Sequence, residues 1–84
     1  MVQNSNTMLF TSDDIKREHI KQLLLAVQDA LNERGYNAVN QISGYLITDD
    51  PAYISSHKNA RAMIQQVERF ELIEELVKFY LESK

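Results

Sequence analysis

The sequence predicts an all-α fold, a compact bundle of about four helices preceded by a flexible N-terminal tail. Apolar residues repeat three or four positions apart from Ile20 to Leu31 and again from Leu72 to Leu81. No stretch alternates apolar and polar residues as a half-buried strand would. Both glycines and the only proline fall within residues 35–51. The residues that break helices are therefore confined to one short part of the chain.

The first eleven residues differ from the rest. Residues 1–11 contain no charged side chain and sustain neither a helical nor a strand period. Because chain ends of this kind stay poorly ordered unless they are tied down, we predict a flexible tail over residues 1–11, whose apolar end can dock transiently on the domain. A chain of 84 residues has room for one core, so residues 12–84 are predicted to form a single helical domain.

The longest predicted helix spans residues 12–34. Thr11 or Ser12 can cap its start, because a hydroxyl there accepts a hydrogen bond from the first turn. Arg34 and then Gly35 end it, since a cation suits the last turn and glycine readily takes a positive φ.

A second, shorter helix follows, with Asn37 as its predicted cap. Its apolar positions are Val39, Ile42, Leu46 and Ile47. Gly44 lies inside this helix, where glycine costs about 1 kcal/mol relative to alanine. We interpret Gly44 as the site where another helix approaches closely, with contact to a ligand as the alternative. Asp50 and Pro51 close the helix, because a residue before proline avoids helical angles.

The sequence from Ser55 to about Leu81 predicts one or two further helices. Ser55 or Ser56 can cap a third helix, and a fourth segment extends to about Leu81. The apolar face of this fourth segment is wider than one antiparallel neighbour requires. No glycine or proline marks a break between the two near Glu68–Phe70, so the sequence leaves open whether they are separate.

The charge balance disfavours nucleic-acid binding. Twelve acidic and nine basic residues give a net charge of −3, and the acids gather in the C-terminal third. Affinity for nucleic acid comes largely from counterion release by Lys and Arg, which needs a basic face. The alternative is a helix-turn-helix-like protein in which Arg61 and Arg69 contact phosphates and Gln65 and Gln66 contact adenine. We expect no nucleic-acid partner.

Catalysis and metal binding are also disfavoured. The chain has no cysteine. His19 and His57 are far apart and form no spaced ligand pair, so each is predicted to be solvated. Asp49 and Asp50 stand beside Pro51 and are interpreted as turn residues. We therefore predict no enzyme, no metal and no cofactor.

The sequence predicts neither membrane insertion nor export. The longest apolar run, over residues 23–27, is too short to span a bilayer. The N-terminus lacks a basic region followed by a long apolar one, so no secretory signal is expected. We expect a cytoplasmic protein.

The stretch over residues 35–54, GYNAVNQISGYLITDDPAYI, carries a family resemblance. With Thr7-Met8 and Phe10 before it, and NAR, ER, EELV and YL after it, it resembles the IreB family of small bacterial proteins. The match covers nearly the whole chain. The sequence departs from the family pattern at several positions, among them Ala38 for a proline, Thr48-Asp49 for Ser-Gly, and Phe70 for an aspartate.

The resemblance implies a non-enzymatic regulatory phosphoprotein that acts through protein–protein interaction. It implies a homodimer that a membrane-anchored Ser/Thr protein kinase phosphorylates in response to cell-envelope stress, together with an unknown downstream protein. Matched residue by residue, Thr7 is the phosphoacceptor. An earlier threonine of some relatives is replaced by Asn4.

Two further groups of residues are assigned roles. Where the chain reverses between helices we predict a structural corner, formed by Gly35, Tyr36, Asn37, Asn40, Gln41, Gly44, Asp50 and Pro51. A chain this short has a thin core, and its broad apolar face near the C-terminus exceeds what a monomer covers. The predicted dimer or partner surface comprises Phe70, Leu72, Ile73, Leu76, Val77 and Tyr80.

Overall fold

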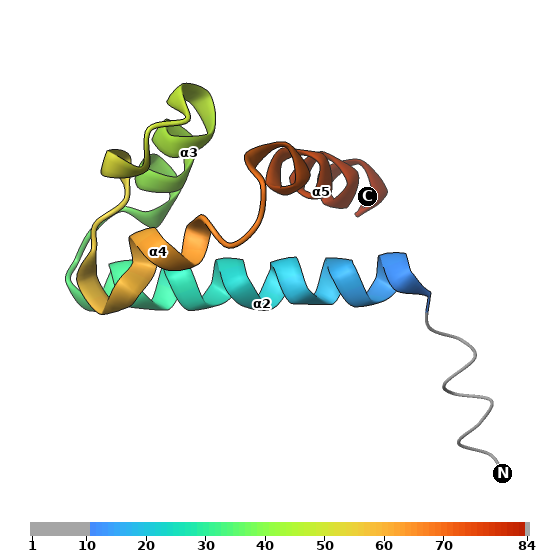
Figure 1. Ribbon diagram of the computed structural model, residues 1–84, viewed down its shortest axis with the longest axis horizontal. Coiled ribbons are helices and arrows are strands. Elements are labelled where there is room, and N and C mark those ends of the chain that lie inside the picture. The colour runs from blue at the N-terminus through green and yellow to red at the C-terminus, as the bar shows by residue number, and fades with distance from the viewer. Residues whose placement is uncertain (1–10, 84) are drawn as a thin grey trace, which may run out of the picture.

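The computed structural model of the protein describes residues 11–83, which are all-α and contain no strand (Figure 1). Its elements, in chain order, are α2 (Ser12–Glu33), α3 (Ala38–Thr48), the 3₁₀ turns η1 (Pro51–Tyr53) and η2 (His57–Asn59), α4 (Ala60–Ile64) and α5 (Arg69–Glu82). The predicted fold class is confirmed. Apart from Thr11, the predicted tail lies outside the described residues.

Helix α2 begins with a reciprocal pair of caps. Thr11 Oγ1 accepts a hydrogen bond from the backbone N–H of Asp14 at 3.1 Å, and the Asp14 carboxylate accepts one from the backbone N–H of Thr11 at 3.1 Å. This capping box satisfies two N–H groups near the start of the helix. Thr11, rather than Ser12, is therefore the cap.

Gly35 turns the chain at the end of α2. Its φ is +78°, in the left-handed region where glycine is not strained. The N–H of Gly35 donates to the carbonyl of Asn32 at 2.9 Å, and that of Tyr36 donates to the carbonyl of Leu31 at 3.0 Å. These are the two hydrogen bonds of a Schellman motif, which satisfies carbonyls that the helix end leaves free.

The core lies along α2, the longest helix of the described chain, on which α3, α4 and α5 pack (Figure 1). Figure 1 shows α4 running beside the C-terminal half of α2, α3 rising away from that end, and α5 above the N-terminal half. The largest fully buried side chains are Ile20, Val27, Leu31, Ile54, Ile64 and Leu72. Helix α5 contributes only Leu72 to the buried core.

The third and fourth predicted helices are separate. Residues 65–68 are non-helical between α4 and α5, although they include neither glycine nor proline. Neither Ser55 nor Ser56 caps α4, whose N-cap residue is Asn59 in a left-handed conformation at φ 65°. Ser55 instead accepts a hydrogen bond from the backbone N–H of His57 at 3.1 Å. The short turn η2 thus occupies the place where the sequence predicted a helix start.

Candidate functional site

Helix α5 has an apolar surface that the other described residues, 11–83, cover only in part. Its exposed large apolar side chains are Phe70, Leu76, Val77, Phe79, Tyr80 and Leu81. Their exposed fractions run from 39% at Leu76 to 80% at Tyr80. Single exposed apolar residues are ordinary, whereas a group on one helix is typical of a contact surface. We call these six residues the α5 surface.

The structure divides the predicted dimer residues between the surface and the core. Leu72 is fully buried, so it belongs to the core and is removed from the predicted contact surface. Ile73 is half-buried beside it. Phe79 and Leu81 are also exposed on α5, at 67% and 65%, and belong to the same surface.

An apolar groove lies between α2 and α5. Its volume is about 460 Å³. Its apolar lining consists of Ile20, Leu24 and Leu25 from α2 and Leu76 and Phe79 from α5. Leu76 and Phe79 therefore belong to both the groove and the α5 surface, which makes the two features continuous.

Basic side chains of α2 hold α5 on its acidic side. Arg17 forms ion pairs with Glu75 and with Glu82, the latter at 3.0 Å between Nη1 and Oε1. Lys16 Nζ lies 3.5 Å from Glu71 Oε2. Glutamates of the acidic C-terminal third are therefore partly engaged with α2. Partners this far apart in the chain leave no local signal in the sequence.

Arg69, the first residue of α5, contacts the end of α3. Its Nη1 donates a hydrogen bond to the carbonyl of Leu46 at 2.9 Å, and its Nε lies 3.3 Å from Asp49 Oδ1. Asp49 is left-handed, with φ 60°. The pKa of nearby Tyr45 is raised, first by burial and then by the negative charge of Asp49. Sequence reasoning missed this contact and offered Arg69 only as a phosphate ligand.

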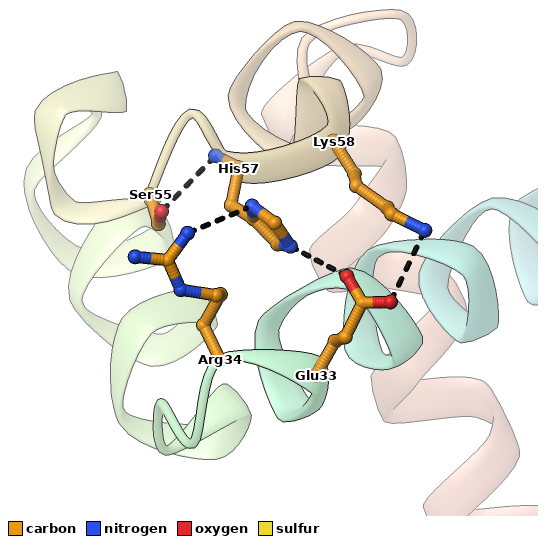
Figure 2. A network of polar contacts seen from close by, with 5 residues as sticks. All are labelled: Glu33, Arg34, Ser55, His57 and Lys58. Atoms are coloured by element: carbon orange, nitrogen blue, oxygen red, sulfur yellow. Dashed lines mark hydrogen bonds and ion pairs between the residues drawn. The ribbon is translucent and has the colours of Figure 1, made fainter.

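A second polar network joins the end of α2 to η2 (Figure 2). His57 Nε2 lies 2.6 Å from one carboxylate oxygen of Glu33, and Lys58 Nζ lies 3.1 Å from the other. Arg34 Nη1 is 3.5 Å from His57 Nδ1. Hydrogen bonds from His57 and then from Lys58 lower the pKa of the Glu33 carboxyl. The prediction that His57 is solvated is wrong, because its side chain is largely covered and has a bonded partner.

Several residues of the predicted corner accept hydrogen bonds from backbone N–H groups. Asn37 Oδ1 accepts from the backbone N–H of Asn40 at 3.0 Å and so caps α3. Gln41 Oε1 accepts from the backbone N–H of Ser55 at 2.9 Å, which ties α3 to the segment after η1. Asp50 Oδ1 accepts from the backbone N–H of Ala52 at 3.0 Å, which begins η1 just before Pro51. Tyr36 is partly exposed beside these contacts.

Gly44 makes its close contact with a side chain of η1. The sequence predicted that another helix would approach this glycine, but the neighbour is the ring of Tyr53. That ring leaves no room for a Cβ atom at position 44. The close approach is present, and the approaching element is a short turn.

Three of the four residues named for the nucleic-acid alternative are engaged within the protein. Arg61 Nε donates to the carbonyl of Ile54 at 2.8 Å, and Gln65 Nε2 donates to the carbonyl of Arg61 at 3.0 Å. Arg69 is held by α3, as described above. These contacts favour structural roles for the three side chains. Thr7, the predicted phosphoacceptor, lies outside the described residues.

Residues 11–83 contain neither a metal-binding cluster nor a membrane-spanning helix. No cluster of three or more histidines and carboxylates is placed there to hold a metal ion. None of the helices in that range is both long and apolar enough to cross a membrane. The α5 surface is the best-defined candidate site of the described chain, because six large apolar side chains lie exposed on one helix.

This fold and this surface define a small all-α protein whose last described helix exposes large apolar side chains. The sequence profile of the family described as "IreB regulatory phosphoprotein" matches residues 5–82. A protein of Ruminiclostridium cellulolyticum described as "UPF0297 protein" is 47% identical over 79 residues, which cover 94% of this chain and 90% of that protein. The chain therefore belongs to the IreB family, as its central motif indicated.

Proposed function

We propose that this protein is a non-enzymatic regulatory phosphoprotein, phosphorylated on Thr7 by a Ser/Thr protein kinase in cell-envelope stress signalling and acting through protein–protein contacts. Membership of a family described as regulatory phosphoproteins supports the regulatory part. The observation that carries the contact part is the α5 surface, whose most exposed member, Tyr80, is 80% accessible. A cytoplasmic location follows from the proposed kinase.

The α5 surface is also the proposed dimer interface. The apolar residues of α5 form two sides of the helix, one beside the groove against α2 and one carrying Phe70, Val77 and Tyr80. Apolar residues around most of a helix are typical of a buried helix. A second copy of the chain would cover the side that this chain leaves exposed, and the small core would gain from it.

The charges around the start of α2 bear on the effect of a phosphate. Asp13 and Asp14 lie in the first turn, and the cations Lys16 and Arg17 that follow are already paired with glutamates of α5. A phosphate on Thr7 adds about −1.5 to −2 charges. Attraction to the helix N-terminus is worth only about 0.3 to 1 kcal/mol at an exposed site. Repulsion by the acids therefore dominates, and phosphorylation would move residues 1–11 relative to the domain of residues 12–84.

The first experiment tests the site. Wild type, Thr7→Ala and the matched control Ser5→Ala are incubated with a Ser/Thr kinase of the same cell, and phosphate incorporation is measured by mass spectrometry. We expect incorporation in wild type and Ser5→Ala and its loss in Thr7→Ala. Equal incorporation in all three would place the phosphate elsewhere, with Thr11 as the next candidate.

The second experiment tests the local nature of the switch. Amide spectra of the phosphorylated and unphosphorylated protein are compared. We expect shifts in the N-terminal segment and the first turn of α2. Shifts spread through residues 20–80 would contradict a change confined to that end of the molecule.

A further inference from the structure

We propose that Asp49 and Arg69 are positioning residues that set the angle of α5 and so present the α5 surface to its partner. The two contacts of Arg69 with the end of α3, the hydrogen bond to Leu46 and the ion pair with Asp49, are together called the α3–α5 latch. The proposal rests on the proposed homodimer for its functional consequence, whereas the latch itself is tested separately below.

The latch places a positive charge at the C-terminal end of α3. The last carbonyls of a helix have no partner within the helix, and the helix dipole makes that end negative. Arg69 Nη1 donates to one of these carbonyls, that of Leu46, at 2.9 Å, while its Nε lies 3.3 Å from Asp49 Oδ1. One guanidinium therefore meets both a backbone acceptor and a carboxylate from the same helix end. This double contact fixes its direction more firmly than a single ion pair would.

The backbone of Asp49 points to a role for its carboxylate. This residue ends α3 at φ 60° and ψ 26°, and its N–H donates to the carbonyl of Tyr45 at 2.7 Å. Glycine is the usual residue at such a position, because a Cβ atom disfavours left-handed angles. Aspartate tolerates the conformation better than most residues but less well than glycine. What aspartate supplies and glycine lacks is the carboxylate that pairs with Arg69.

The angle of α5 depends on few contacts. The helix follows a non-helical link over residues 65–68, and Leu72 is its only buried core residue. A helix anchored by one buried side chain near its start can pivot about that anchor. The latch adds a second fixed point at Arg69, on α3, and the ion pairs of Arg17 add contacts on α2. Loss of the latch would leave the start of α5 held by the buried side chain of Leu72 and by the ion pair of Glu71 with Lys16.

A small pivot at the start of α5 is enlarged at its far end. Tyr80 lies eleven residues after Arg69, a helical distance of about 16 Å. A rotation of about 10° would therefore move Tyr80 by about 3 Å, which is enough to spoil packing at an interface. In a two-fold dimer the same displacement occurs twice, because each copy uses the same surface.

The test uses a variant that removes the ion pair of the latch without straining the backbone. Asp49→Gly deletes the carboxylate and suits φ 60°, so its melting temperature should stay close to that of wild type. Its dimer dissociation constant, measured by sedimentation equilibrium, should rise by about tenfold, as expected for loss of a coupled contact. Arg69→Lys keeps the positive charge but loses the second N–H contact. Its dissociation constant should therefore lie between those of wild type and Asp49→Gly. If the dissociation constant of Asp49→Gly equals that of wild type, the proposal is overturned. The matched control is Glu74→Gln, which changes a charge on an exposed part of α5.

Amide hydrogen exchange tests the latch whether or not the protein dimerises. Asp49→Gly should exchange about tenfold faster than wild type throughout residues 69–82, with residues 23–33 of α2 unchanged. Unchanged exchange in α5 would overturn the latch. If wild type sediments as a monomer at every concentration, the homodimer fails while this measurement still decides the latch.

Discussion

The ring of Tyr53 stands where a side chain on Gly44 would begin. A Cβ atom at Gly44 would lie 2.6 Å from Tyr53 Cδ1 and 3.1 Å from Tyr53 Cε1. Real Cβ atoms do not approach other atoms so closely, so the glycine is what allows η1 to lie against α3. The helix therefore contains a residue that costs about 1 kcal/mol relative to alanine, because the Tyr53 ring leaves no room for a Cβ atom.

The effect of Gly44→Ala on stability should therefore reverse its sign when the Tyr53 ring is removed. In wild type we expect it to destabilise the protein by about 1 kcal/mol, because displacing the Tyr53 ring outweighs the gain in helix propensity. In a Tyr53→Ala background the same change should stabilise by about 1 kcal/mol. Urea unfolding of the four proteins measures both. Stabilisation by alanine in both backgrounds would show that the ring yields at no cost, as would Gly44→Leu melting within a degree or two of wild type.

The network around Glu33 predicts a loss of stability in acid. Hydrogen bonds from His57 and Lys58 lower the pKa of Glu33 below its unfolded value of about 4.3. A carboxyl whose pKa is lower in the folded state stabilises the fold above its unfolded pKa, and this contribution is lost as pH falls through the folded pKa. Glu33→Gln should lower the melting temperature at pH 6 and make its decline below about pH 5 shallower. Glu74→Gln is the control, since Glu74 has no ion pair with another described residue. The same dependence of melting temperature on pH in the two variants would contradict the prediction.

Two asparagines of one helix provide a matched test of capping. Asn37 Oδ1 accepts the backbone N–H of Asn40, so Asn37→Ala should cost about 1 kcal/mol of stability. Asn40→Ala makes the same chemical change inside the helix, where alanine is the better helix former, and should be neutral or slightly stabilising. Chemical unfolding compares the two. Equal losses would show that the side chain of Asn37 does not act as the cap.

The proposed dimer predicts a response to charge on the α5 surface. Val77→Glu and Tyr80→Glu should raise the dimer dissociation constant at least tenfold, because each would place a carboxylate in an apolar interface. Ile47→Glu is the control, since Ile47 on α3 is as exposed as Tyr80, at 79%. Sedimentation at micromolar concentration provides the measurement. A wild-type mass of 9.7 kDa that does not change with concentration would contradict the dimer itself.

The sequence by itself was sufficient to predict the helix ends that are set by contacts between neighbouring residues. Gly35 ends α2, Asn37 caps α3, and Thr11, one of the two predicted candidates, caps α2, each through hydrogen bonds to backbone groups no more than five residues away. Such contacts follow from local residue type, so a linear pattern predicts them. The family followed in the same way, because its motif is a continuous stretch.

Tertiary structure decided the features that join distant parts of the chain. Glu33 and His57 are 24 residues apart, Leu46 and Arg69 are 23 apart, and Arg17 and Glu82 are 65 apart. It also moved Leu72 from the predicted surface into the core and separated α4 from α5 without a glycine or proline. These outcomes depend on which face of each helix packs against α2. Helical spacing shows that an apolar face exists, but the partner of that face is fixed only when the helices pack together and exclude water.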